Sequence, residues 1–413
     1  MAKHLKGFII GISNVAFVEG QGDANKFSEV ERLLEYLLAK GIQPVIFGNR
    51  DWFSIDSKTG VKSRLQDVLQ GVWQQVPWII ANRDGTPHKP QAAAVQYLLN
   101  RFGWDAAETV YLGNTVDDMR TAVNGGVLFL NAIWYGQNSD YGVIFASPLD
   151  VARFVDTFCL REHLWHYRIE LGSLRYYALS PYSTMIPAYE YLSNDARAAA
   201  KWGQGHPDFW TKYIWSTLYF SELYKEIDYI AAYPGHVEGS GNAVVEDPML
   251  AFSRCFRMTY LRDFVVRHTA SQKSSQARNR GIPIGYLNQL NTIRLQEFPV
   301  RSDGTRRYKH CPVEAGKTVL VIDDICTNGY SLEAARAYIE QTGAKVICLS
   351  WLKTISSDYK EIRAMRNFDP FVANTFTAEP QHMSHPYAGY VADRIAPEEV
   401  TQKLRAYDAW KWP

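Results

Sequence analysis

Two adjacent acids and a short polar turn give one segment of this chain clear chemical content. An apolar run beginning at Lys317 leads into Asp323 and Asp324, and a turn spanning 327–331 follows. Backbone N–H groups of such a turn, and of the helix that it opens, suit a phosphate, and Gly329 allows a close approach. Paired carboxylates accept hydrogen bonds from sugar hydroxyls and hold Mg²⁺. The segment predicts a sugar-phosphate site; the alternative is an acidic strand end followed by an ordinary helix cap.

The stretch 317–331 resembles the signature that binds phosphoribosyl pyrophosphate (PRPP) in type I phosphoribosyltransferases. That signature is an apolar strand, two aspartates and a Thr-Thr-Gly-x-Thr/Ser turn, and this sequence departs from it only at Asn328. In that family the turn holds the 5′-phosphate and the acids bind the ribose hydroxyls. The resemblance implies that Asp323 and Asp324 are catalytic and hold Mg²⁺. It also implies phosphate contacts from Thr327, Asn328, Gly329, Tyr330 and Ser331.

Three other segments fit the same kind of site. Gly235 and His236 lie in a glycine-rich loop after an expected strand, where the family has its pyrophosphate loop. The polar segment 267–280 resembles the corresponding loop of the ComF-like subgroup, which implies a lid over the substrate. The segment 349–354 resembles that subgroup's strand ending in Lys-Thr, which implies that Lys353 contacts the acceptor base. The basic candidates in the lid are Arg267, Lys273, Arg278 and Arg280.

Residues 254–309 carry twelve basic and three acidic side chains. A local excess of this sign attracts an anionic substrate and neutralises charge on a leaving pyrophosphate. Two alternatives stay open. The stretch is a nucleic-acid-binding strip on which Tyr260, Tyr286 and Tyr308 stack bases, or it is a solvated basic face.

The N-terminal third holds a second group of chemistry-bearing positions. His88-Lys89-Pro90 and the stretch 111–126 resemble the third and fourth motifs of haloacid-dehalogenase-like (HAD) phosphatases. In that family an aspartate ending the first strand attacks phosphorus, and other acids, a hydroxyl and a lysine complete a phosphate and Mg²⁺ site. The matching positions in this chain are Gly11, Ser13, Gly48, Lys89, Asn114 and Asp118.

Only Lys89 and Asp118 keep the side chains that this chemistry uses. Without a carboxylate at Gly11 there is no aspartyl-phosphate nucleophile, and Asn114 lowers the charge of the metal site. The resemblance therefore implies an inactive domain used for binding or assembly. A pocket that still binds a ligand through Lys89, and a purely structural ion pair between Lys89 and Asp118, both remain open.

Hydrophobic periodicity places these motifs in α/β domains. Short apolar runs alternate with amphipathic helical segments over 7–135 and again over 227–354, which predicts two doubly wound parallel sheets. The region between them is dense in aromatic residues and predicts a helical connector that is partly core and partly interface. The expected parts are 1–147, 148–226, 227–354 and a C-terminal tail, 355–413, packed on the second domain.

The composition bounds the class of protein. With 413 residues, 46% of them apolar, 21% charged and a net charge of +1, the chain is expected to be a folded, non-membrane protein with at least two cores. The near-zero charge gives no support for nucleic acid as the main partner. The five widely spaced cysteines fit a reducing cytoplasm.

These observations favour a PRPP-dependent transferase that displaces pyrophosphate from C1 of PRPP with an unidentified acceptor, and that carries an inactive scaffold domain. The main alternative is a nonenzymatic sensor of PRPP or a nucleotide. A third interpretation, compatible with either, is a component of a bacterial stress or defence assembly. In that case a protein partner or a second copy would dock on the aromatic connector.

Overall fold

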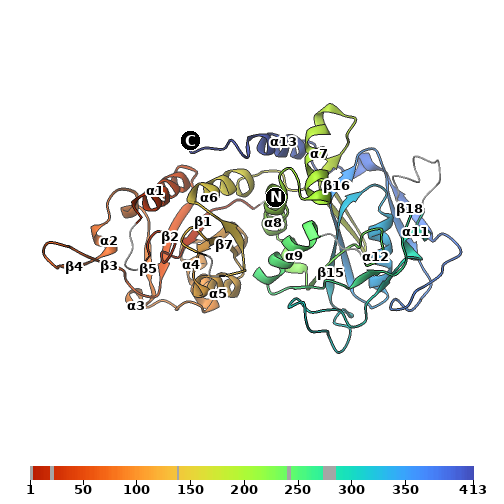
Figure 1. Cartoon of the computed structure of the whole chain (residues 1–413), viewed down its shortest axis with the longest axis horizontal. Helices are drawn as coiled ribbons and strands as arrows, with labels where there is room; N and C mark the ends of the chain where they lie inside the picture. The colour runs from red at the N-terminus through yellow and green to blue at the C-terminus, as the bar shows by residue number, and fades with distance from the viewer. Residues whose placement is uncertain (1–2, 19–22, 137–138, 240–242, 273–284) are drawn as a thin grey trace.

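Two six-stranded sheets, one in each lobe, organise the chain, with helices α8 (Pro207–Phe220) and α9 (Ala243–Cys255) between them (Figure 1). The computed structural model describes residues 3–18, 23–136, 139–239, 243–272 and 285–413. The predicted α/β class with a parallel N-terminal sheet is confirmed. Within the described ranges, no helix is long and apolar enough to cross a membrane.

The N-terminal sheet is parallel and buried on both faces. Phe8 and Ile10 belong to one apolar core and Ile9 to another, because successive side chains of a strand point to opposite faces. Helices α1 (Ala24–Ala39) and α6 (Pro148–Phe154) cover one face, and α4 (Ala92–Phe102) and α5 (Val116–Gly125) cover the other. The strand order is β5 (Trp78–Ile80), β2 (Gln43–Gly48), β1 (Gly7–Ile10), β6 (Thr109–Gly113), β7 (Leu128–Ala132) and β8 (Val143–Phe145).

The second sheet draws two of its strands from the predicted connector. Five strands are parallel and β9 is antiparallel to β10. The expectation that 148–226 is a helical connector is therefore wrong for 167–182, which form a hairpin inside the sheet. The strand order is β12 (Thr259–Tyr260), β11 (Tyr229–Ala232), β15 (Thr318–Cys326), β16 (Lys345–Thr354), β10 (Leu174–Tyr182) and β9 (Tyr167–Leu171).

Helix α8 joins the two lobes through its aromatic side chains. Trp210, Tyr213 and Tyr219 are fully buried in a core that continues from the N-terminal sheet to the second sheet. The ring of Trp210 stacks on that of Trp351 in β16, with centroids 6.0 Å apart. The expectation that the aromatic connector is an outward docking surface is corrected for α8, because its rings form an interface inside the chain.

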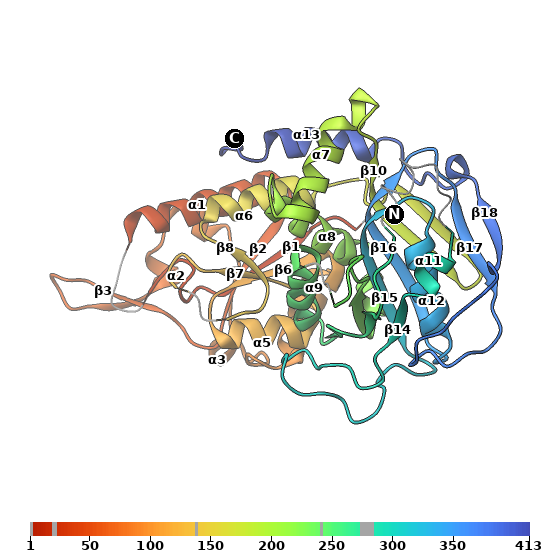
Figure 2. The same ribbon diagram turned by 45° about the vertical axis from the view of Figure 1, so that its right-hand side comes forward.

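The C-terminal segment contacts both lobes. Strands β17 (Tyr359–Ala364) and β18 (Gln381–His385) form a hairpin beside the second sheet, and α13 (Ala396–Ala406) packs on α7 (Pro187–Trp202). Beyond α13 the chain returns to the N-terminal lobe, and both figures show it running towards α1 (Figure 2). There Trp410 and Trp412 pack edge-on against Tyr36. The predicted packing of the tail on the second domain therefore describes only part of the contacts that the tail makes.

Shorter elements complete the described part of the chain. Two small sheets pair β3 (Phe53–Ile55) with β4 (Lys62–Arg64) and β13 (Val265–Arg267) with β14 (Ile293–Leu295). The remaining α-helices of the described ranges are α2 (Leu65–Val68), α3 (Ala81–Asp84), α11 (Leu287–Leu290) and α12 (Tyr330–Glu340).

Candidate functional site

Most of the described candidate residues of the second domain meet at one edge of its sheet. Strands β11, β15 and β16 are neighbouring parallel strands, so their carboxyl ends reach the same edge. The loop after β11 begins at Tyr233, whose N–H donates to the carbonyl of Ile322 at 2.8 Å. The two acids lie near the end of β15, and Lys353 lies near the end of β16.

Asp323 and Asp324 are adjacent acids whose carboxylates are each held by a backbone N–H group. An Asp323 oxygen accepts the N–H of Asp324 at 2.8 Å, and an Asp324 oxygen accepts the N–H of Ile325 at 2.7 Å. Burial and the neighbouring Asp324 carboxylate raise the pKa of Asp323. A pKa of about 8 leaves Asp323 largely protonated near neutral pH, so the negative charge of the pair lies mainly on Asp324, and a cation bound there would favour ionisation of both acids.

Lys201 supplies a positive charge to this pair. Its ammonium lies 2.5 Å from an Asp324 oxygen. Burial opposes this charge, but the two acids keep the pKa of Lys201 above its ordinary value. Lys201 lies on α7, inside the predicted connector and 123 positions from Asp324. No local sequence pattern marks it, so sequence reasoning missed it.

The predicted phosphate turn starts helix α12. Gly329 is the N-cap residue, with φ of +87°, and a Cβ on it would lie 2.6 Å from the ring of Tyr359. Both observations require glycine here. The hydroxyls of Thr327 and Thr354 are 3.0 Å apart, which ties the start of the turn to the end of β16.

Asn328 has a structural role in this conformation. Its side-chain amide donates to the carbonyl of Asp358 at 3.2 Å, and its own carbonyl accepts the N–H of Lys360 at 2.9 Å. The Asn328 side chain, which the resemblance implied as a phosphate contact, thus holds the turn to the segment that leads into β17. Tyr330 begins α12 and packs edge-on against Tyr286, with ring centroids 4.7 Å apart.

Lys353 points into the protein. Its ammonium donates to the carbonyls of Thr327 at 2.6 Å and Thr354 at 3.3 Å, and also to that of Ser357. The side chain is fully buried, and burial lowers its pKa. The expected acceptor-base contact is corrected, because three carbonyls match the three N–H groups. Lys353 is a positioning residue for the turn.

Arg267 is also buried, and its guanidinium makes three hydrogen bonds within the chain. Its guanidinium donates to the Gly235 carbonyl at 2.9 Å, to the Thr292 hydroxyl at 2.5 Å and to the Gln289 side chain at 3.1 Å. Only 2% of Arg267 is exposed, so it is not an exposed lid residue as predicted but holds the loop after β11. In that loop His236 is exposed, and its carbonyl accepts the N–H of Ser271 at 3.0 Å.

The other lid candidates, Lys273, Arg278 and Arg280, lie outside the described residues. The nucleic-acid alternative loses two of its three stacking candidates, because Tyr260 and Tyr286 are buried. Tyr308 remains partly exposed, with the guanidinium of Arg301 4.8 Å from its ring centroid.

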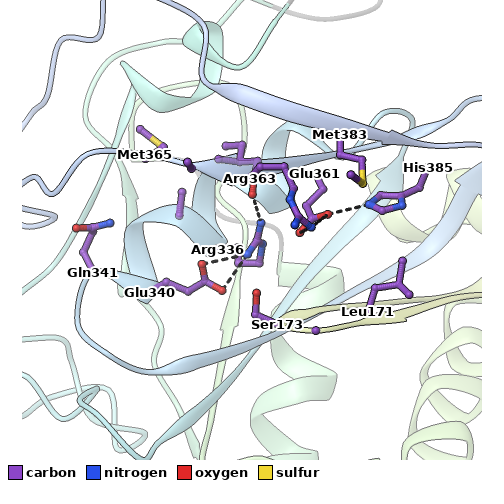
Figure 3. Close-up of a pocket in the computed structure, with 14 residues that line it drawn as sticks. Leu171, Ser173, Arg336, Glu340, Gln341, Glu361, Arg363, Met365, Met383 and His385 are labelled. Carbon is purple, nitrogen blue, oxygen red and sulfur yellow. Dashed lines mark hydrogen bonds and ion pairs between the residues drawn. The ribbon is translucent and has the colours of Figure 1, made fainter.

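A cavity of about 760 Å³ lies beside the second half of α12 (Figure 3). Its charged groups pair with one another. Arg336 donates to Glu340 at 2.9 Å and to the carbonyl of Ile362 at 2.7 Å, and His385 lies 2.8 Å from Glu361. Arg336 also pairs with the fully buried Glu333 at 2.6 Å. The contact of Arg336 with the Ile362 carbonyl joins the β17–β18 hairpin to α12, and the His385–Glu361 contact joins the two strands of the hairpin. Together they stabilise β17, which contacts the turn 327–331.

The N-terminal site is closed around Asp118. One Asp118 oxygen lies 2.6 Å from the Lys89 ammonium and accepts the Tyr111 hydroxyl at 2.8 Å, while the other accepts the Thr115 hydroxyl at 2.7 Å. A Cβ on Gly11 would collide with this carboxylate, and one on Gly113 would lie 2.5 Å from the Asp118 Cβ. Asp118 thus occupies the space in which a nucleophile at position 11 would stand.

Asn114 and Ser13 do not add an acid to this site. The Asn114 amide donates to the carbonyls of Ala132 at 2.5 Å and Gly136 at 2.7 Å, so it joins two backbone segments. Ser13 is half-buried and pairs with Phe17 in an isolated bridge. Across the described ranges, no group of three or more His, Cys, Asp or Glu side chains is placed to hold a metal ion.

Comparison with protein-family models and with curated proteins gives no match. Among solved structures, a predicted phosphoglycolate phosphatase from Haemophilus somnus 129PT is similar at 21% identity with a TM-score of 0.24, over 30% of this chain and 54% of that one. The cobalt-bound deoxy-D-mannose-octulosonate 8-phosphate phosphatase from Haemophilus influenzae is similar at 16% identity with a TM-score of 0.25, over 37% and 84%. This chain therefore spans about half of the first structure. The residue roles proposed below rest on this chain's own geometry.

Substituting Gly329 by alanine tests the turn. Gly316→Ala is the matched control, since Gly316 has φ of +88° but a Cβ there has no described neighbour within 4 Å. We expect Gly316→Ala to lower the free energy of unfolding by about 1 kcal/mol through backbone strain alone. Gly329→Ala should cost about 1–3 kcal/mol more, because it also collides with Tyr359. Urea unfolding measures both, and equal costs would contradict the described packing.

Removing Arg336 tests the hairpin contact. Arg336→Ala leaves the buried Glu333 without its charged partner and should lower the free energy of unfolding by about 3–5 kcal/mol. Arg363→Ala breaks a pair with Glu361 at 3.1 Å whose arginine is half exposed, and should cost less than about 1 kcal/mol. Similar losses in the two variants, measured by urea unfolding, would show that the Glu333–Arg336 pair is not buried as described.

The N-terminal site is tested by stability and by turnover. Lys89→Met strands a buried carboxylate and should cost about 3 kcal/mol or more in urea unfolding. Lys6→Met removes an exposed lysine from the nearly buried Glu108, which keeps its contacts with Lys3 and with the N–H of Asp105, and should cost less than about 1 kcal/mol. We expect no Mg²⁺-dependent phosphatase turnover from the wild type. Turnover that Asp118→Asn abolishes would overturn the structural interpretation of this site.

Proposed function

We propose that this protein is a PRPP-dependent phosphoribosyltransferase. The observation that carries the proposal is the placement of Asp323, Asp324 and the turn 327–331 at the carboxyl end of β15, with α12 starting at the turn. This edge is where parallel α/β sheets bind ligands. The pyrophosphate loop proposed after β11 begins beside the same strand.

In this proposal each part of the edge contacts a different part of the substrate. The turn residues Thr327 to Ser331 bind the 5′-phosphate through backbone N–H groups and hydroxyls. Asp323 and Asp324 accept hydrogen bonds from the ribose hydroxyls. The loop containing Gly235 and His236 binds the pyrophosphate. The bond from C1 to pyrophosphate breaks as the bond from C1 to the acceptor forms.

The donor set fits Mg²⁺ that enters with its substrate. Two carboxylates are too few to enclose the ion, but Mg²⁺ commonly takes one or two carboxylates and completes its shell with substrate phosphates and water. Asp323 and Asp324 would hold it here. When bound, the ion would neutralise negative charge that develops on the leaving pyrophosphate.

We infer that the N-terminal domain is a scaffold related to HAD-like phosphatases without their catalysis. The support is the set of contacts to Asp118, which fills the nucleophile's space and pairs with Lys89. A scaffold role agrees with the continuous core that α8 shares with both sheets.

The second candidate function is a PRPP or nucleotide sensor. Two observations favour it. The core shared between the two lobes gives a physical route from the proposed ligand edge to the N-terminal domain. In addition, Lys353 faces the protein interior, so the described residues contain no assigned acceptor contact. Binding without transfer would satisfy this candidate.

The acid pair is the first target for mutation. Asp323→Asn combined with Asp324→Asn should abolish the rise in thermal midpoint that Mg²⁺–PRPP causes in the wild type, because both sugar contacts and the cation site are lost. Asp369→Asn, an exposed acid, is the control and should keep the full rise. An unchanged rise in the double variant would exclude this site.

Pyrophosphate release then separates the two functions. Mg²⁺–PRPP is incubated with the full chain and fractions of a cell extract. Release that needs one fraction and both acids supports a transferase and identifies the acceptor class. Binding of PRPP without release in any fraction would favour the sensor.

A further inference from the structure

The ammonium of Lys201 occupies a position at the acid pair where a divalent cation would otherwise find an open carboxylate. It lies 2.5 Å from an Asp324 oxygen, and the Asp324 side chain is only 13% exposed. The other Asp324 oxygen accepts the N–H of Ile325 at 2.7 Å. Asp324 therefore has a partner on each oxygen before any ligand arrives.

The fold fixes the backbone that carries Lys201. Helix α7 begins with Pro187 and packs against β10, β16 and α9, and Figure 1 shows it above the sheet near β16. The helix ends immediately after Lys201, at the left-handed cap Gly203 with φ of +63°. The Lys201 side chain is 43% exposed, so its end can turn while the helix stays in place.

A free divalent cation must displace this ammonium to reach Asp324. The displacement removes an existing favourable contact and places like charges close together, so it weakens binding of the bare ion. A cation that arrives on a diphosphate changes the balance, because the phosphates give the released ammonium a new negative partner.

We propose that Lys201 is a resident counter-ion that excludes a free divalent cation from Asp323 and Asp324, and that moves to the phosphates of an incoming cation–diphosphate substrate. This inference rests on the proposed function for the identity of the substrate. It makes cation and substrate binding mutually dependent, and it adds a phosphate-binding residue from a helix outside the motif segments.

Mn²⁺ binding to the full chain without PRPP tests whether Lys201 excludes a free divalent cation. The unbound ion is followed by electron paramagnetic resonance. We expect Lys201→Gln to bind Mn²⁺ about five- to tenfold more tightly than the wild type, because the competing charge is gone. Lys201→Arg should behave like the wild type. Lys225→Gln is the matched control, since Lys225 is a 48% exposed lysine paired with Glu222 elsewhere on the surface.

The gain in Mn²⁺ affinity must depend on the acid pair. Adding Asp324→Asn to Lys201→Gln should remove it. Equal Mn²⁺ affinity in Lys201→Gln and the wild type, or a gain that survives Asp324→Asn, would overturn the counter-ion role. Thermal midpoints of all variants show whether the fold is kept.

The proposed movement of Lys201 to the substrate phosphates is tested with PRPP at saturating Mn²⁺. Lys201→Gln should bind PRPP at least about threefold more weakly by calorimetry, since one phosphate contact is lost. Unchanged affinity would overturn the transfer to phosphate. If no variant binds PRPP while Lys201→Gln still gains Mn²⁺ affinity, the proposed function fails and the counter-ion role stands.

Discussion

One buried ammonium, that of Lys353, organises the edge of the second sheet at which we propose that a ligand binds. It joins carbonyls from the turn 327–331, the end of β16 and the segment leading to β17. A buried charge is costly unless its hydrogen bonds are satisfied, so this arrangement selects one conformation of three chain segments. The rings of Tyr167 and Tyr387 lie 5.5 and 5.6 Å from it and add to its environment. The turn is thereby held in shape before a ligand binds.

The supporting contacts extend from that point along α12. Tyr359 packs against Gly329 and donates to Glu333 at 2.8 Å, and Glu333 pairs with Arg336. The turn 327–331 and helix α12 therefore pack against the β17–β18 hairpin. On the other side Lys201, whose side chain is 43% exposed, pairs with Asp324, and this is the contact that we propose a substrate replaces. The turn and α12 are thus held by buried contacts, whereas the contact between Lys201 and Asp324 is partly exposed.

The N-terminal domain also contains a buried charged group whose hydrogen bonds are satisfied, the carboxylate of Asp118. Lys89, Tyr111 and Thr115 satisfy Asp118, and the missing Cβ atoms of Gly11 and Gly113 make room for its carboxylate. Both oxygens of the Asp118 carboxylate therefore have partners within the chain. The domain instead contributes to the core that α8 extends into the second sheet.

Sequence reasoning succeeded where the relevant residues are consecutive. The end of β15, the acids and the start of α12 follow one another, so strand, turn and helix signals sit in one window. It failed where burial decides the role. The direction of Lys353 and Arg267 depends on distant carbonyls, and Lys201 reaches Asp324 only through the placement of α7. The β9–β10 hairpin had a readable signal, two apolar runs around Gly172-Ser173, which the aromatic content obscured.

The most direct test of the central claim is a crystal structure of the full chain with Mg²⁺ and PRPP. We predict the 5′-phosphate on the turn 327–331, the ribose hydroxyls on Asp323 and Asp324, and Lys353 unchanged among its carbonyls. PRPP bound elsewhere, or a turn that accepts no phosphate at saturating ligand, would contradict the account.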